Sequence, residues 1–191
     1  MCIRDSFNSD LKNFRISSIN QKNIILEKLG VDFVIIKKFD KKFSKIKSNF
    51  FIKEILAKKL KPKYIFVSNN FKFGNKREGN VNQLIKNEKI HDYKIIKPQP
   101  LTLSQRVISS TYIRSLLKKG NLKKTNNLLR RNWSIEGKVQ KGRQLGKKIG
   151  FPTCNLDIMD YVIALPGVYA VTVKQKNSHK PLKAIANLGY R

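Results

Sequence analysis

The sequence is poor in the residues that build metal centres and disulfide frameworks. It holds two cysteines, Cys2 and Cys154, and two histidines, His91 and His179, all far apart along the chain. Isolated residues of these types give neither the spacing of a zinc site nor a disulfide scaffold. We therefore interpret both histidines as ordinary core or surface residues, and we expect a reducing compartment, the cytoplasm.

Long apolar runs are also absent. No stretch approaches the roughly 20 apolar residues that a transmembrane helix needs. Residues 1–6, MCIRDS, lack the basic and apolar regions of a signal peptide. The sequence therefore predicts no export and no membrane partner.

Acidic residues are scarce, because 12 aspartates and glutamates face 41 lysines and arginines, for a formal charge of +29 at pH 7. Such a charge favours a basic nucleic-acid-binding protein, which we keep as the alternative function. However, 32 of the cations are lysines, and they are spread through every segment instead of forming one stripe. We therefore predict no specific nucleic-acid partner, only weak, salt-dependent binding to polyanions.

The 191 residues, 40% of them apolar, suffice for one large or two small domains. Helix-like and strand-like patterns alternate in the first half. Helices are predicted at 14–30, 49–60 and 81–90, buried strands at 31–36 and 64–67, and a further strand at 93–96. This alternation predicts an open parallel α/β sheet whose ligands bind beyond the carboxyl ends of the strands.

A loop rich in aromatic residues and glycine, SNNFKFGNKREGN, occupies 68–80 at such a strand end. Phe71 and Phe73 precede Gly74 and Gly79, and basic residues lie among them. Two interpretations stay open for this loop. Either it stacks on a planar ring and holds a phosphate, or its two aromatic rings plug the edge of the sheet.

A second polar segment, ISSTYIR, covers 108–114. Its Ser-Ser-Thr run predicts a helix N-cap, and Gly120 predicts the end of that helix. Arg114 lies one turn inside, where backbone donors and the helix dipole favour an anion. The alternative is a plain capped helix, and a second short helix is predicted at 122–131.

The stretch 134–156, SIEGKVQKGRQLGKKIGFPTCNL, holds four glycines interleaved with basic residues. Glycine lets backbone N–H groups approach a ligand closely, so this stretch predicts a phosphate cradle. If Thr153 and Asn155 lie on one strand, their oxygen atoms share a face and suit Mg²⁺ bound to nucleotide phosphates. A glycine-rich hairpin with a charged rim is the alternative. Short strands at 135–139, 153–158, 167–173 and 182–188 predict an all-β C-terminal part.

These motifs resemble two enzyme families. The pattern from Gly137 to Leu156 resembles the opening motif of riboflavin kinase, and PGVYAV and ANLGYR, at 166–171 and 186–191, resemble its next elements. The segments 68–80 and 108–114 resemble two signatures of FMN adenylyltransferase. The order of the matches is that of the bacterial bifunctional riboflavin kinase/FMN adenylyltransferase, or FAD synthetase.

The resemblance implies a fold, an activity and a site. The fold is α/β, with a Rossmann-like nucleotidyltransferase remnant at 7–130 followed by an all-β, incomplete riboflavin-kinase barrel at 131–191. The activity is ATP-dependent phosphorylation of riboflavin to FMN and adenylylation of FMN to FAD, with Mg²⁺ as cofactor and the oligomeric state left open. The implied nucleotide-binding residues are Ser109, Ser110, Thr111, Arg114, Gly142, Gly146, Lys147, Gly150, Phe151, Pro152, Thr153 and Asn155. The implied flavin-binding residues are Asn70, Phe71 and Gly74, and the implied metal ligands are Thr153 and Asn155.

The family pattern also includes elements that this sequence does not hold. The resemblance implies an H-x-G-H phosphate motif upstream of Arg15 and a general-base glutamate beyond Asn187. Neither is present, so no catalytic residue is assigned, and we expect the chain to be an inactive fragment of its parent enzyme. Residues 1–6 do not match the family, and we interpret them as non-native sequence.

Overall fold

The computed structural model describes residues 13–140, 150, 153–158, 160–175, 178 and 180–189, which divide into two compact units. The first unit is Ile35–Val107. The second unit combines the described parts of 10–34 and 108–191. Within the part of the chain that the structure describes, every helix is too short or too polar to span a bilayer.

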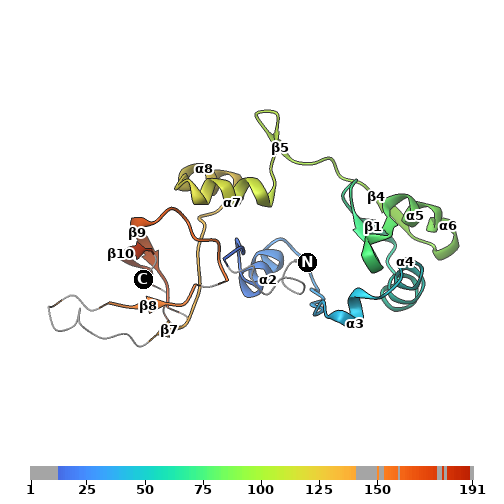
Figure 1. The fold of residues 1–191 in the computed structure, drawn as a ribbon, viewed down its shortest axis with the longest axis horizontal. Coiled ribbons are helices and arrows are strands. Elements are labelled where there is room, and N and C mark those ends of the chain that lie inside the picture. Colours follow the sequence, from blue (N-terminus) through green and yellow to red (C-terminus); the bar gives the residue numbers. More distant parts are fainter. Residues whose placement is uncertain are drawn as a thin grey trace. The chain divides into compact units, whose positions relative to one another are not determined.

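The first unit is a small α/β structure (Figure 1). Its strands β1 (Tyr64–Phe66) and β4 (Lys94–Ile96) pair in parallel, with Ile65 opposite Ile95, which confirms the predicted parallel pairing. Its helices are α3 (Lys41–Ser44), α4 (Ser48–Phe50), the π-helix η1 (Phe51–Leu60), the 3₁₀-helix η2 (Asn75–Arg77), α5 (Val81–Lys86) and α6 (Glu88–His91). Its strands are β1 (Tyr64–Phe66), β2 (Lys72–Phe73), β3 (Gly79–Asn80), β4 (Lys94–Ile96), β5 (Thr102–Leu103) and β6 (Arg106–Val107).

The core of the first unit lies between η1, α5 and β4. The helix predicted at 49–60 is confirmed, and it ends at Lys61 in the left-handed conformation, immediately before Pro62. It is a π-helix, which apolar spacing alone does not distinguish from an α-helix. The buried residues are Ile52, Leu56, Phe73, Val81, Leu84, Tyr93 and Ile95.

Two strand predictions require correction. The run 31–36 forms no strand, and Phe33, Ile35 and Ile36 are 89%, 73% and 59% exposed. A strand exists only through pairing, and among the described residues none pairs with this run, which passes from one unit to the other. The strand at 64–67 does form as β1, but it is not buried, because its terminal residues Tyr64 and Phe66 are exposed.

The second unit combines helices with short antiparallel ribbons (Figure 1). Its elements are α2 (Ile19–Lys28), α7 (Ser110–Lys118), α8 (Leu122–Leu129), β7 (Val139–Gln140), β8 (Asn155–Leu156), β9 (Gly167–Val173) and β10 (Leu182–Leu188). The predicted bounds of β9 and β10 are confirmed, and the two strands pair over their full length. The strand predicted at 135–139 shares only Val139 with β7, and the strand predicted at 153–158 shortens to β8. Among the described residues, β7 and β8 pair only with each other. The described residues form no closed barrel, as expected of an incomplete one.

The core of the second unit is built on α7 and α8. Its buried residues are Ile113, Leu116, Leu117 and Leu128 from the helices, and Val162 and Ala164 from the segment before β9. Gly120 ends α7 with a φ of +70°, which confirms the predicted helix end. The side chain of Leu165 would lie 3.1 Å from a Cβ atom at that glycine.

Tyr93 makes the stability of the first unit sensitive to alkaline pH. Its hydroxyl donates to the carbonyl of Leu84 at 2.8 Å, and burial, aided by the Glu88 carboxylate, raises its pKa from 10.0 to about 12. The folded state therefore resists ionisation of this phenol. Its contribution to stability is complete below pH 10.0 and is lost as the pH rises through about 12.

We expect Tyr93→Phe to remove most of this alkaline loss, because phenylalanine has no proton to release. The measurement is urea unfolding of both proteins over this pH range. Tyr64→Phe, at an exposed tyrosine of β1, is the matched control. A wild-type protein and a Tyr93→Phe variant that lose stability in parallel would contradict this assignment.

Candidate functional site

The N-terminus of α7 presents polar groups to solvent. Ser109 is the N-cap, and its hydroxyl oxygen accepts the backbone N–H of Tyr112 at 3.1 Å. Ser110 and Thr111 follow in the first turn, and all three residues are exposed. The first N–H groups of a helix have no intrahelical acceptor, and the helix dipole is positive at this end. This helix end is therefore suited to an oxyanion.

Arg114 is fixed one turn further along α7. The residue is half-buried, and its Nε atom donates to the carbonyl oxygen of Phe14 at 2.7 Å. A guanidinium held through Nε keeps a restricted orientation, so little side-chain entropy remains to be lost when it binds an anion. The structure thus places all four predicted residues of 109–114 in one helical turn and a half.

The loop 68–80 packs its aromatic residues against the core. Phe73 is buried and lies between Phe51 and Phe71, with ring centroids 5.4 Å and 5.7 Å away. Phe71 is partly buried against the same core. Phe73 therefore has a packing role in the core of the first unit. Asn70 stays exposed, and its Oδ1 atom accepts the hydroxyl of Ser68 at 2.9 Å.

Ser48, at the start of α4, packs closely against this loop. Cβ atoms placed on Gly74 and Gly79 would both lie 2.8 Å from Ser48 atoms, and Gly74 has a φ of +77°. The Glu78 carboxylate accepts the backbone N–H of Ser48 at 2.7 Å. The side-chain amide of Gln83 donates to the Ser48 hydroxyl at 3.1 Å. Gly74, predicted from the sequence to bind flavin, therefore has a demonstrable packing role.

Glu78 and Ser48 were missed by sequence reasoning because they meet across 30 positions of the chain. One signal was present, since a carboxylate is uncommon among so many cations and Glu78 stands directly before a glycine. The N-cap of α4, Lys47, provides no side-chain acceptor. The Glu78 carboxylate takes over that capping function from a distance.

We expect Glu78→Ala to destabilise the first unit by about 1 kcal/mol, the usual cost of losing a helix cap. Glu78→Gln keeps an oxygen acceptor and should recover most of this loss. Urea unfolding of the three proteins is the measurement. Equal midpoints for Glu78→Ala and the wild type would show that the contact contributes nothing.

The glycine-rich stretch is described only at its ends. Gly142, Gly146, Lys147, Phe151 and Pro152, all predicted nucleotide-binding residues, lie outside the described residues. The remaining predicted residues are Gly150, exposed with a φ of +81°, Thr153, exposed, and Asn155, half-buried on β8 opposite Gln140.

The shared face predicted for Thr153 and Asn155 stays a prediction, since only Asn155 belongs to a strand. Gly137, which opens the stretch, has a structural reason to be glycine. A Cβ atom there would lie 2.8 Å from the carbonyl oxygen of Asp157.

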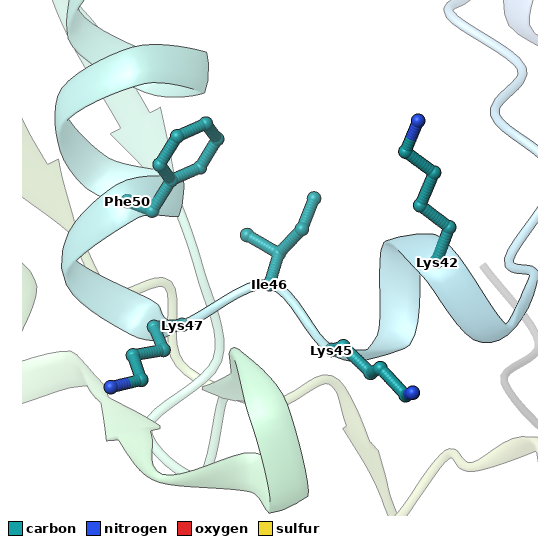
Figure 2. Close-up of a pocket in the computed structure, with 5 residues that line it drawn as sticks. All are labelled: Lys42, Lys45, Ile46, Lys47 and Phe50. Carbon is teal, nitrogen blue, oxygen red and sulfur yellow. The ribbon is translucent and has the colours of Figure 1, made fainter.

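A shallow hollow of about 300 Å³ lies elsewhere, between α3 and α4. Figure 2 shows Ile46 at its floor, with Lys42 and Phe50 rising on either side, whereas Lys45 and Lys47 point away. None of the predicted site residues lines this hollow, so we do not include it in the candidate site.

Two family models match the chain in sequence order. Residues 4–112 match FAD synthetase, and residues 129–191 match riboflavin kinase. The α/β unit lies within the first matched region, and the strands β7, β8, β9 and β10 lie within the second. The chain belongs to the FAD synthetase family, with a riboflavin kinase segment after it. We call residues 4–112 and 129–191 the FAD synthetase segment and the riboflavin kinase segment.

Curated relatives carry both names. The bifunctional riboflavin kinase/FMN adenylyltransferase of Haemophilus influenzae is 37% identical over 177 residues, which are 93% of this chain and 57% of that protein. The enzyme of the same name from Escherichia coli (strain K12) is 35% identical over 185 residues, which are 97% of this chain and 59% of that protein. The chain therefore spans less than two thirds of the length of these relatives. None of these matches is described as a nucleic-acid-binding protein.

A solved structure supports the fold. A Streptococcus pneumoniae protein, described as a macrolide-efflux protein, matches with a TM-score of 0.73 and 27% identity, covering 91% of this chain and 55% of its own. The efflux activity belongs to that protein's description, and neither the family models nor the curated relatives given above share it.

Proposed function

We propose that the parent protein of this chain makes FMN and FAD. The riboflavin kinase segment transfers the γ-phosphoryl group of ATP to the ribityl hydroxyl of riboflavin. The FAD synthetase segment lets the FMN phosphate attack the α-phosphate of a second ATP, which releases pyrophosphate. We keep 7–130 and 131–191 as the two domains and the cytoplasm as the location.

The α7 N-terminus is the observation that carries this proposal. Its exposed donors from Ser109 to Thr111 and the fixed Arg114 supply positive charge where nucleotide phosphates would bind. Phosphoryl and nucleotidyl transfers are accelerated mainly by positioning and charge neutralisation. A preorganised arginine beside helix N–H groups supplies both.

The other proposed roles follow the family motifs. Thr153 and Asn155 would hold Mg²⁺, an ion that accepts oxygen ligands and neutralises charge on the transferring phosphate. Gly142, Gly146, Lys147, Gly150, Phe151 and Pro152 would cover the nucleotide of the kinase reaction. Asn70 and Phe71, beside Gly74, would contact the flavin or the adenylate.

Calorimetric titration of this chain with ATP in the presence of Mg²⁺ tests the proposal without requiring turnover. We expect binding that Arg114→Ala weakens, because the phosphates lose their main cation at α7. Arg130→Ala, at an exposed arginine just beyond α8, is the control for a general loss of charge. Binding that falls equally in both variants would indicate nonspecific attraction to a basic chain and overturn the proposal for α7.

A further inference from the structure

The segment 14–21, which is part of the FAD synthetase segment, contacts both Arg114 on α7 and residues of the riboflavin kinase segment. On one side, its Phe14 carbonyl oxygen accepts the Nε–H of Arg114. On the other side, Arg15 bridges to Asp160–Val162, since its N–H donates to the Asp160 carbonyl at 2.8 Å and its own carbonyl accepts the Val162 N–H at 2.8 Å. One short segment therefore touches the predicted phosphate-binding arginine and the riboflavin kinase segment.

Two larger side chains strengthen this connection. The indole N–H of Trp133 donates to the carbonyl oxygen of Ile16 at 2.9 Å. The Arg131 guanidinium donates to the hydroxyl of Ser17 at 2.6 Å, and Ser17 is only 6% exposed. Burial lowers the pKa of Arg131 from its ordinary value. A partly desolvated guanidinium makes its hydrogen bonds more valuable, because leaving it unpaired would be costly.

The N-terminal cap of α2 takes part as well. Ser18 and Gln21 form a reciprocal capping box, with hydrogen bonds of 3.0 Å and 2.9 Å. Gln21 also donates to the carbonyl and hydroxyl oxygens of Ser134, each at 3.1 Å, and accepts the hydroxyl of Tyr161 at 3.2 Å. The Ser18 hydroxyl donates to the carboxylate of Glu136. A helix cap with three further partners, Ser134, Glu136 and Tyr161, fixes the start of the glycine-rich stretch as well as its own helix.

Apolar packing accompanies these polar contacts. Val162 and Ala164, which are 1% and 2% exposed, enter the core made by α7 and α8. Leu188 of β10 packs against the same core. The helix that carries Arg114 is therefore buried in part by the riboflavin kinase segment itself.

We propose that these contacts, which we name the 14–21 junction, form a specific interface that couples the position of Arg114 to the riboflavin kinase segment. Nucleotide binding at α7 and the arrangement of residues 131–136 then depend on each other, because such coupling is reciprocal. The inference rests on the proposed role of Arg114 in holding phosphate. It adds Phe14, Ser17 and Gln21 as positioning residues, which act through their contacts with Arg114, Arg131 and Ser134.

The sequence contains a single tryptophan, Trp133, and it lies inside the junction. Its fluorescence therefore reports on the junction without a label. We would titrate the chain with ATP and Mg²⁺ in a Thr153→Ala/Asn155→Ala background, so that the kinase nucleotide site is disabled. We expect the nucleotide to change Trp133 emission, although the proposed ligand contacts lie on α7.

Two junction variants and one control sharpen the test. Gln21→Ala and Ser17→Ala remove different contacts, and each should raise the Kd for ATP with Mg²⁺ by at least about fivefold, the lower range of site-to-site coupling. Each should also speed tryptic cleavage after Arg131 in the absence of nucleotide by about fivefold, as expected for the loss of one hydrogen bond. Asn20→Ala, at the exposed neighbour of Gln21 on α2, should match the parent in both measurements.

The outcomes separate this inference from the proposed function. Calorimetric binding with unchanged Trp133 emission, and with equal Kd values in the junction variants, would overturn the junction and leave the proposed function standing. Absence of binding in every protein would overturn the proposed role of α7. The interface itself would then be supported by faster cleavage in both junction variants, and refuted by cleavage at the parent rate.

Discussion

Gly74→Ala is expected to destabilise the first unit by about 2 to 6 kcal/mol, a large share of the stability of a small domain. Two causes add. Gly74 has φ and ψ of +77° and 178°, a conformation almost confined to glycine. A Cβ atom would also lie 2.8 Å from the backbone nitrogen of Ser48 and 2.9 Å from its Cα atom, and backbone cannot move aside cheaply. Urea unfolding of this variant and the wild type measures the loss.

Gly30→Ala separates the two causes. Gly30 has a similar φ of +79°, but a Cβ atom there would meet nothing within 4 Å. Its substitution should therefore cost only about 1 kcal/mol, the usual penalty for a side chain at a glycine that follows the end of a helix. Equal losses of unfolding free energy in the two variants would contradict the claim that close packing on Ser48 requires glycine at position 74.

Thr153→Ala and Asn155→Ala should each reduce riboflavin phosphorylation by about 100-fold or more, because each removes a proposed oxygen ligand of Mg²⁺ beside the transferring phosphate. The measurement is FMN formation by a full-length protein that includes the segments its relatives carry outside the matched region. Raising the Mg²⁺ concentration should recover part of the lost activity, since a weakened site fills by mass action.

Cys154→Ala is the matched control, because Cys154 lies between the two proposed ligands and is exposed. We expect near wild-type rates, because a cysteine side chain offers no oxygen ligand for Mg²⁺. Loss of activity in Cys154→Ala as large as in Thr153→Ala would show that the segment is sensitive to any change. A metal role for the two oxygen-bearing residues would then be unsupported.

Local sequence signals predicted the elements whose causes are local. Ser109 and Gly120 mark the two ends of α7, where a hydroxyl accepts an N–H three residues ahead and a glycine adopts a positive φ. The strands β9 and β10 form a hairpin pair, so each finds its partner a few residues along the chain. In both cases the stabilising contact lies within the segment that carries the signal.

Sequence patterns did not predict the structure where the contacting residue lies far along the chain. The apolar pattern of 31–36 states a preference for a strand, but no described strand pairs with it, and its side chains stay exposed. The packing of the loop 68–80 depends on Ser48, and no sequence pattern distinguishes this serine from the others. The contacts of Gln21 with Ser134 and Tyr161 span 113 and 140 positions, and no periodicity encodes them.

The candidate site divides in the same way. The helix end at 109–114 was predicted from its residues, because a cap and a following arginine are adjacent in sequence. Its connection to Phe14 was not, since the acceptor is a backbone carbonyl and carries no side-chain signature. For Gly74 the motif was noticed, but the cause of the glycine, close packing on Ser48, became clear only from the structure.

Chromatography of the products that the full-length protein forms from riboflavin and ATP with Mg²⁺ tests the proposed function most directly. We expect FMN to appear first and FAD to follow. We further expect Arg114→Ala to slow formation of FAD selectively, whereas Thr153→Ala should slow formation of FMN by about 100-fold or more. A folded full-length protein that forms neither flavin nucleotide would contradict the proposed function.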